Sequence, residues 1–173
     1  PITGQKKLSV VKRPGFATQS TPSAGNAGYA IMVWTGSGNG TDVISAFGAT
    51  NSTIYSGTSS LGAITGRCTG ITETNINGSG ALAITSSDNT GWVYTVAVGV
   101  MTEITDVDFP GNAGKTLAGT FAHLNGFACI STTDGGLYAS DLNSLTGWTS
   151  NSFDSANTSP DPSVGCLRFK TFI

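Results

Sequence analysis

Asp106 and Asp108 are two residues apart and lie shortly before Pro110. They are the first candidates for a functional site. In a β-strand, side chains two positions apart lie on the same face, so these carboxylates could bind a cation or act as an acid pair. The proline favours a loop, in which an aspartate accepts hydrogen bonds from nearby backbone amides. We favour this loop-capping interpretation. A glycosidase would need paired carboxylates, and Glu73 and Glu103 are the two glutamates of the chain.

The histidine and the cysteines indicate no second site. His123 is the single histidine, and no cysteine, aspartate or glutamate stands near it at the spacing of a metal ligand. Cys68, Cys129 and Cys166 are odd in number and widely spaced, a pattern typical of neither a disulfide framework nor a metal knuckle. Cys129 has apolar neighbours and is expected in the core. The sequence predicts no enzyme, no metal and no cofactor.

The tryptophans are the remaining side chains with recognisable chemistry. Trp34, Trp92 and Trp148 could stack on sugars or bases, but packing inside the fold is the favoured role. Exposed tryptophans would instead fit a glycan-binding β module of a virion or secreted protein, which is our alternative hypothesis. A hydrolase with a propeller fold is a third and less favoured one.

The composition is unusually neutral. Charged residues make up 10% of the 173-residue chain and its net charge is −2, whereas about 25% of a typical globular protein is charged. Such a surface suits a member of an assembly or a rigid β protein rich in hydroxyl groups. Eight lysines and arginines are too few to wrap duplex DNA. Lys12 and Arg13 form part of a small basic segment over 1–20, for which a solvated terminus is the favoured interpretation. No apolar run reaches the ~20 residues that span a bilayer, so we expect no membrane partner.

The elements that would position these residues are short strands joined by turns. Glycine, serine, threonine and asparagine recur too often for a stable helix. The range 29–34 is a continuous apolar run, typical of a buried strand. Turn-forming residues separate apolar runs and predict three hairpins, which join 29–34 to 42–47, 81–85 to 92–96, and 127–131 to 137–140. The sequence predicts an all-β fold built as an antiparallel hairpin array.

A weak repeat favours a particular arrangement of these hairpins. Ile84 and Ile130 are 46 residues apart, Tyr94 and Tyr138 are 44 apart, and Ile44 precedes Ile84 by 40. A period of about 40–50 residues made of short strands is typical of β-propeller blades, and a β-sandwich is the alternative.

The expected organisation is a lead-in segment followed by an incomplete propeller. We assign 1–20 to the lead-in and 21–173 to the blades. Two or three blades do not close a propeller, which has roughly four to eight. The alternating residues of 166–173 predict a last strand with no partner after it. We therefore expect another fragment or chain to complete the structure.

Several short segments of the chain occur in an order and spacing that can be compared with a known protein family. They are Lys12-Arg13-Pro14-Gly15, the stretch 105–110, Gly126-Phe127, the stretch 138–143, Trp148 and Ser159-Pro160-Asp161. In this order and spacing, the chain resembles the N-terminal part of the tail-hub, or packaged-DNA stabilisation, proteins of short-tailed bacteriophages.

The resemblance implies a structural role in a virion tail. Such a protein would be a β-propeller subunit, present in six copies in a ring below the portal and adaptor rings and assembled in the cytoplasm of the bacterial host. It would help to retain packaged DNA, which passes nearby without sequence-specific binding, and would attach a tail needle or fibres. The candidate interaction or loop residues are Lys12, Arg13, Asp106, Asp108, Trp148 and Asp161.

Overall fold

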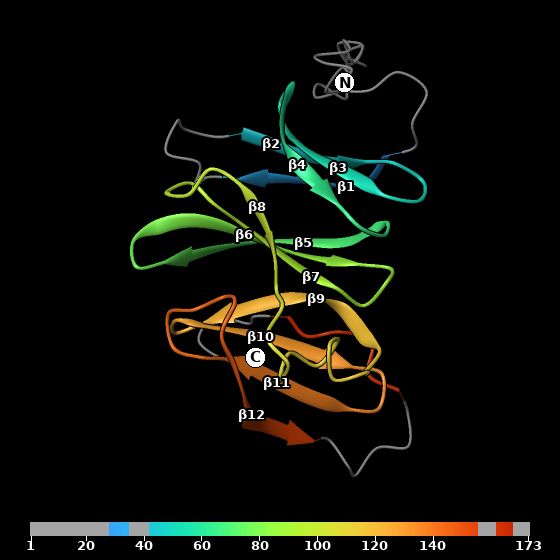
Figure 1. Cartoon of the computed structure of the whole chain (residues 1–173), viewed down its shortest axis with the longest axis vertical. Coiled ribbons are helices and arrows are strands. Elements are labelled where there is room, and N and C mark those ends of the chain that lie inside the picture. The colour runs from blue at the N-terminus through green and yellow to red at the C-terminus, as the bar shows by residue number, and fades with distance from the viewer. Residues whose placement is uncertain (1–27, 35–41, 156–161, 168–173) are drawn as a thin grey trace, which may run out of the picture.

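The computed structural model describes residues 28–34, 42–155 and 162–167, and its regular elements in these ranges are all β-strands. Within them, twelve strands form three antiparallel sheets of four strands each. Figure 1 shows the three sheets stacked one above another. The prediction of an all-β, antiparallel fold is confirmed. No helix of the described ranges is long and apolar enough to cross a membrane.

Each sheet is a meander in which every strand pairs with the next one along the chain. The first sheet contains β1 (Gly28–Trp34), β2 (Asp42–Phe47), β3 (Ser52–Ser56) and β4 (Ser59–Ile64). The second sheet contains β5 (Cys68–Ile76), β6 (Ser79–Ser86), β7 (Gly91–Thr95) and β8 (Met101–Glu103). The third sheet contains β9 (Leu117–Leu124), β10 (Phe127–Thr132), β11 (Gly136–Ser140) and β12 (Trp148–Ser155). The three hairpins expected from the sequence correspond to the antiparallel pairs β1–β2, β6–β7 and β10–β11.

Local turn chemistry fixes the long hairpins of the second and third sheets. Asn77 and Gly78 join β5 to β6 with φ angles of 50° and 82°, and Asn125 and Gly126 join β9 to β10 with 51° and 88°. Two successive positive φ angles form the turn whose twist matches that of a β-hairpin, and Asn-Gly is the dipeptide that adopts it most readily. These turns set the register of both hairpins.

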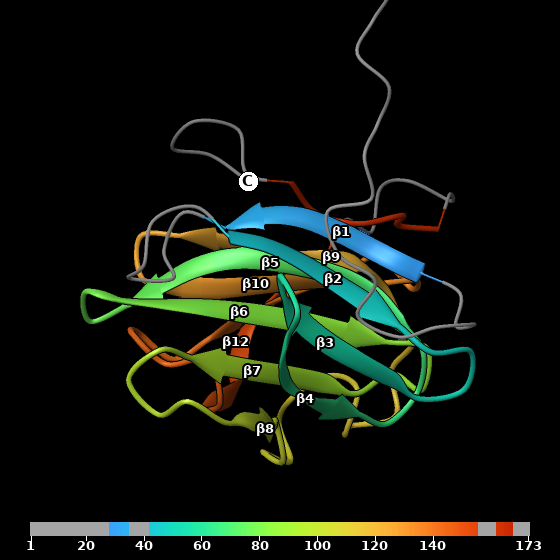
Figure 2. The same ribbon diagram turned by 90° about the horizontal axis from the view of Figure 1, so that it is seen from above.

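The sheets stack so that equivalent strands lie close together. β1 contacts β5 and β5 contacts β9, while β4 contacts β8. Figure 2, seen along the stack, shows β1, β5 and β9 on one side and β4 and β8 on the other. The backbones approach closely at Gly70 of β5, where a Cβ atom would lie 2.6 Å from the Cβ of Thr120 on β9. The Thr72 hydroxyl bonds to the Thr120 hydroxyl and donates to the Phe121 carbonyl at 2.6 Å.

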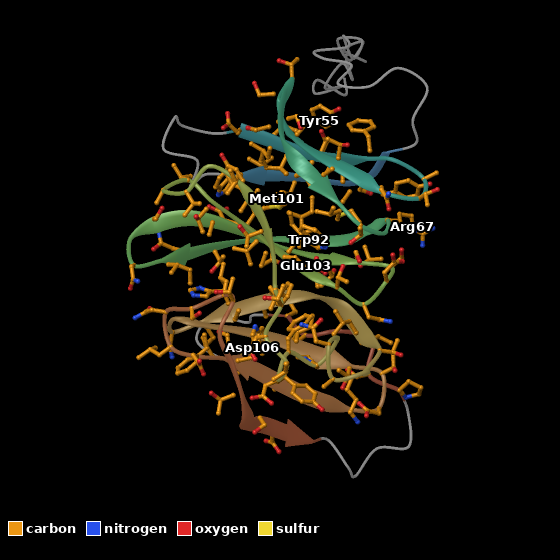
Figure 3. The ribbon with its side chains drawn as sticks, viewed as in Figure 1. Tyr55, Arg67, Trp92, Met101, Glu103 and Asp106 are labelled. Atoms are coloured by element: carbon orange, nitrogen blue, oxygen red, sulfur yellow. The ribbon has the colours of Figure 1, made fainter. Side chains whose placement is uncertain are left out.

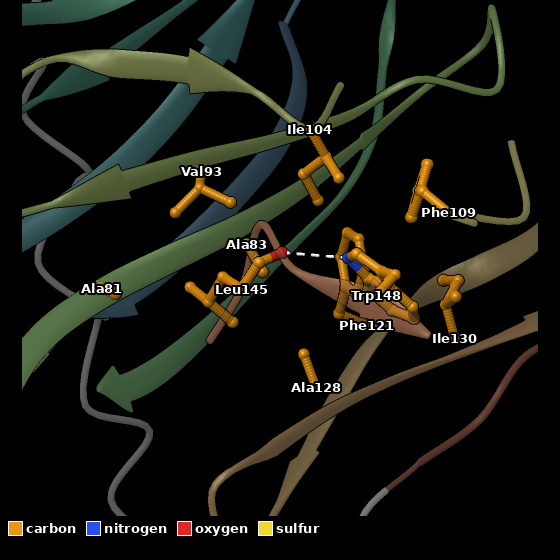
Figure 4. Packing of buried hydrophobic residues seen from close by; sticks show 10 residues of the cluster. All are labelled: Ala81, Ala83, Val93, Ile104, Phe109, Phe121, Ala128, Ile130, Leu145 and Trp148. Atoms are coloured by element: carbon orange, nitrogen blue, oxygen red, sulfur yellow. Dashed lines mark hydrogen bonds between the residues drawn. The ribbon is translucent and has the colours of Figure 1, made fainter. Parts of the chain in front are cut away.

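Two apolar cores lie between the sheets, one on each side of the second sheet. The core between the first and second sheets contains Trp34, Ile44, Ala46, Ile54, Ile64, Cys68, Leu82 and Ile84. The core between the second and third sheets contains Ala81, Ala83, Val93, Ile104, Phe109, Phe121, Ala128, Ile130, Leu145 and Trp148 (Figure 4). β6 serves both cores, because alternate side chains of a strand point to opposite faces. The middle sheet is therefore covered by protein on both sides.

The sequence repeat reflects equivalent positions in the three sheets. Ile44, Ile84 and Ile130 lie on β2, β6 and β10, the second strand of each sheet, and each is fully buried. Tyr94 and Tyr138 lie on the third strands, β7 and β11. The period thus corresponds to one four-stranded sheet.

One sequence expectation fails over the residues that the structure describes at the end of the chain. We expected a strand over 166–173, but 162–167 form no strand, and 168–173 lie outside the described residues. Alternation alone does not make a strand, because the backbone also needs a partner for its hydrogen bonds. The turn of the predicted hairpin between 29–34 and 42–47 also lies outside the described residues.

Candidate assembly surface

Asp106 is a loop-capping residue in this structure. It lies in the connection between β8 and β9, and its Oδ1 accepts a hydrogen bond from the Asp108 amide at 3.0 Å. Its Oδ2 accepts one from the Trp148 amide at 3.1 Å, although Trp148 stands 42 residues further along the chain. One carboxylate therefore joins the 105–110 loop to the start of β12. Figure 3 labels Asp106. Asp106 and Asp108 lie in a loop, so the same-face argument for a strand does not apply to them.

Replacing Asp106 by alanine should destabilise the fold by about 1–3 kcal/mol, because the amide of the buried Trp148 would lose its acceptor. Asp108→Ala is the matched control. It should change the free energy of unfolding by no more than about 0.5 kcal/mol, because the carboxylate of Asp106, not that of Asp108, accepts both hydrogen bonds. Urea denaturation of both variants measures the difference. Equal free energies of unfolding for the two would contradict the capping role.

The other predicted site residues fall in two groups. Trp148 is 4% exposed and its indole Nε1 donates to the Leu145 carbonyl at 3.1 Å, so it is a core residue in the described structure. Lys12, Arg13 and Asp161 lie outside the described residues. Of the six candidates, the structure brings together Asp106, Asp108 and Trp148.

Burial disfavours the thiolate form of the three cysteines. Burial raises the pKa of Cys68 and of Cys129 to about 11, because an apolar environment disfavours the thiolate. Burial raises the pKa of Cys166 as well. Among the residues that the structure describes, no group of three or more histidine, cysteine, aspartate or glutamate side chains is placed to hold a metal ion.

A solvent-exposed ion pair marks the β10–β11 turn. Lys115 Nζ lies 2.7 Å from Asp134 Oδ2. The hydrogen bond from Lys115, with a second from the Thr132 hydroxyl, lowers the pKa of Asp134 to about 2.

The Asp134 carboxylate should therefore stabilise the fold above about pH 4, the ordinary pKa of an aspartate, and lose this effect as the pH falls through about 2. The effect on stability is small because both groups are exposed. A carboxyl-detected NMR titration should give a pKa of about 2, and Lys115→Met should raise it. An Asp134 pKa near 3.9 in the unaltered protein would contradict the pairing.

The largest unexplained feature is the outer face of the first sheet. Along β1, Ala30, Met32 and Trp34 point into the core, whereas the intervening Ile31 and Val33 are 76% and 57% exposed. Because successive side chains of a strand point to opposite faces, the exposed set lies on the side away from the second sheet. Apolar side chains predominate on this face, although Ser45, opposite Ile31, and Thr53, opposite Phe47, also belong to it. No sheet of the described residues covers it.

The outer face extends across neighbouring strands. Val43 of β2 pairs with Val33 and is 43% exposed. On the same side of the sheet, the rings of Phe47 and Tyr55 meet edge to face with centroids 6.1 Å apart. Figure 3 shows Tyr55 at the end of the stack, beyond the first sheet. We define the outer face by its five apolar and aromatic side chains, Ile31, Val33, Val43, Phe47 and Tyr55.

One charged side chain packs on an aromatic ring at the start of β1. The guanidinium carbon of Arg67, in the loop after β4, lies 5.2 Å from the centroid of the Tyr29 ring. A cation at this distance from an aromatic face is attracted to it. The centre of the outer face is left to side chains without charge.

The sequence carried a pattern that could have revealed this surface. A continuous apolar run such as 29–34 is typical of a strand covered on both faces. The structure covers one face of β1 with the second sheet and leaves the other exposed, so the prediction of a buried strand is met on one side only.

The segment 162–167 lies against β9, the first strand of the third sheet. The Cys166 thiol donates to the carbonyl of Cys129 at 3.5 Å or of Thr120 at 3.6 Å. The backbones meet at two glycines, since a Cβ on Gly119 would lie 2.8 Å from the Cα of Gly165. Val164 and Leu167 of this segment are 90% and 81% exposed, and Leu167 lines a pocket together with Ile71 and Thr72 of β5, so the segment lies beside the first strands of the second and third sheets. On the third sheet itself, Phe127 of β10 is 36% exposed and has the opposite orientation to the core residues Ala128 and Ile130.

Comparison with known proteins found no family model, no curated protein and no solved structure that matches this chain. The assignment of a function therefore rests on the residues and on the geometry described above.

Proposed function

We propose that this chain is a structural protein that works by assembly, and that its outer face is covered by another four-stranded sheet. The observation that carries this proposal is β1, whose side chains are apolar on both faces while one face is exposed. Leaving such a surface in water is unfavourable by about 25 cal/mol for each Å² of apolar area. The second sheet shows how the same chain covers a sheet on both sides.

The proposed occupant is the third sheet of a second copy of the chain. At one end of the stack the outer face exposes Ile31 and Val33, and at the other end the third sheet exposes Phe127 of β10. Two different surfaces that join head to tail form a closed ring when the rotation between copies allows it. Two copies would contribute six sheets, within the four to eight that close a β-propeller.

The propeller itself is part of this proposal. Each sheet is a four-stranded meander, and the first strands β1, β5 and β9 contact one another in succession. Both features are typical of propeller blades arranged around a central axis. A sandwich has two packed sheets, and the three stacked sheets therefore favour the propeller.

We further propose a place for this assembly in the tail hub of a short-tailed bacteriophage, because of the resemblance of the sequence to that family. Two matching segments, 105–110 and Trp148, are joined by the hydrogen bond from the Trp148 amide to Asp106. The partners would be the portal and adaptor rings, the needle or fibre proteins and further copies of the chain. Packaged DNA would pass nearby.

Multi-angle light scattering of the purified chain tests the assembly. We expect a mass of about twice the 17.5 kDa of one chain, with dissociation on dilution. A monomer at all accessible concentrations would exclude a second copy as the occupant. A complex formed only with a further fragment of the same gene product would assign the outer face to that fragment.

The tail-hub assignment needs a separate experiment. Native mass spectrometry with peptide mapping of the particle that contains the chain should find it in a multi-copy ring with portal and adaptor proteins. Its recovery from a particle or cell fraction without those proteins would contradict the phage assignment and leave the assembly proposal standing.

A further inference from the structure

A polar cavity opens between the first and second sheets, at one end of their strands. Its volume is about 330 Å³, within the range of small-molecule sites and large enough for on the order of ten water molecules. Five of its lining residues carry polar side-chain atoms, and they come from β1, β2, β3, β4 and β7. They are Trp34, Asp42, Ser56, Ser59 and Tyr94.

Trp34 makes this cavity unusual. The residue is 2% exposed, and its indole Nε1 is a buried donor without a hydrogen-bond acceptor. Its ring packs edge to face against the Tyr94 ring, with centroids 6.0 Å apart. This donor is enclosed by protein, so a molecule in the cavity would meet the two aromatic rings rather than the Nε1 atom.

The remaining wall groups define what such a molecule would be. The hydroxyls of Ser56, Ser59 and Tyr94 can each donate and accept a hydrogen bond, whereas the Asp42 carboxylate only accepts. A ligand that matches this set must carry several groups that both donate and accept. Hydroxyl groups have that property.

The cavity also has apolar walls, formed by Leu61, Val96 and the ring of Trp34. A pyranose sugar combines a ring of hydroxyls with an apolar face of C–H bonds, so its two kinds of surface match the two kinds of wall. We propose that this cavity binds a polyhydroxylated ligand of monosaccharide size, such as one residue of a glycan.

This site is independent of the proposed assembly. Trp34 belongs to the core between the first two sheets, on the side of β1 opposite to the outer face. The cavity lies at the ends of the strands, where Asp42 begins β2 and Ser59 begins β4. A second sheet stacked on the outer face would leave it open, so the two proposals can fail separately.

Isothermal titration with glucose, galactose, mannose, fucose and N-acetylglucosamine tests the proposal. We expect at least one sugar to bind with a dissociation constant on the order of 1 mM or lower. Asp42→Asn should weaken binding about tenfold, the factor for loss of one charge-assisted hydrogen bond. The matched control is Asp88→Asn, which changes a turn carboxylate before β7, at the end of that strand away from Tyr94.

Amide chemical-shift mapping on the unaltered protein gives a second measurement that needs no variant. Binding at this site should shift the amides of Ser56, Ser59 and Tyr94 and leave those of the third sheet unchanged. No saturable binding by any of the five sugars would overturn the proposal. Binding that is insensitive to Asp42→Asn, or that shifts amides elsewhere, would overturn it as well.

Discussion

Ile31→Lys should leave the chain folded but convert the assembled protein into monomers. Ile31 is 76% exposed at the centre of the outer face, so the fold itself gains little from it. In the assembly its burial is worth about 1.5–3 kcal/mol, and the variant would also place a charge in an apolar interface. Self-association should weaken by at least ~100-fold, a change that corresponds to roughly 3 kcal/mol. Sedimentation velocity over a concentration series measures it.

Val107→Lys is the matched control for this experiment. Val107 is 78% exposed, almost as much as Ile31, but lies in the loop between β8 and β9, away from the outer face. This variant should assemble as the unaltered protein does. If both lysine variants dissociate equally, the effect is one of charge in general, and the outer face is not the interface.

Trp148→Ala should destabilise the fold by about 3–5 kcal/mol, the range for removing a large buried aromatic side chain. Trp148 is 4% exposed, and its ring meets Phe109 edge to face at 5.1 Å and Phe121 at 6.3 Å. Its indole also donates to the Leu145 carbonyl, the bond drawn as a dashed line in Figure 4. Alanine would leave a cavity between the second and third sheets and an unpaired carbonyl. Thermal and urea unfolding measure the loss.

Two further variants separate the contributions to this effect. Trp148→Phe retains most of the aromatic volume but loses the bond to Leu145, so it should cost about 1–3 kcal/mol. Trp92→Ala removes a half-buried ring whose Nε1 bonds to the Thr90 hydroxyl, and should cost less than Trp148→Ala. A larger loss at Trp92 than at Trp148 would show that the core between the second and third sheets contributes less than its packing indicates.

Much of the fold follows from local sequence. Asn125 and Gly126 adopt a turn that few other dipeptides adopt, and apolar runs on either side then pair as β9 and β10. The three predicted hairpins, β1–β2, β6–β7 and β10–β11, could be found because each joins residues close together in the chain. The β9–β10 hairpin was not predicted, although its Asn-Gly turn is an equally local signal. The equivalent positions of Ile44, Ile84 and Ile130 also followed from their spacing, because each sheet uses a similar length of chain.

The sites depend on contacts between distant residues. The spacing of Asp106 and Asp108 suggested a pair, but the tertiary structure joins Asp106 to Trp148, 42 residues away. No local pattern specifies that bond, because it depends on how the loop after β8 reaches β12.

The sequence by itself indicated the strands of three hairpins, the turns within them and which side chains are apolar. Alternation along β1 places Ile31 and Trp34 on opposite faces, but it does not say which face will be covered. Only the stacking of the sheets decided this, burying Trp34 against the second sheet and leaving Ile31 exposed. The physical reason is that strand pairing is set largely by neighbours in sequence, whereas burial is set by whatever packs on the finished sheet.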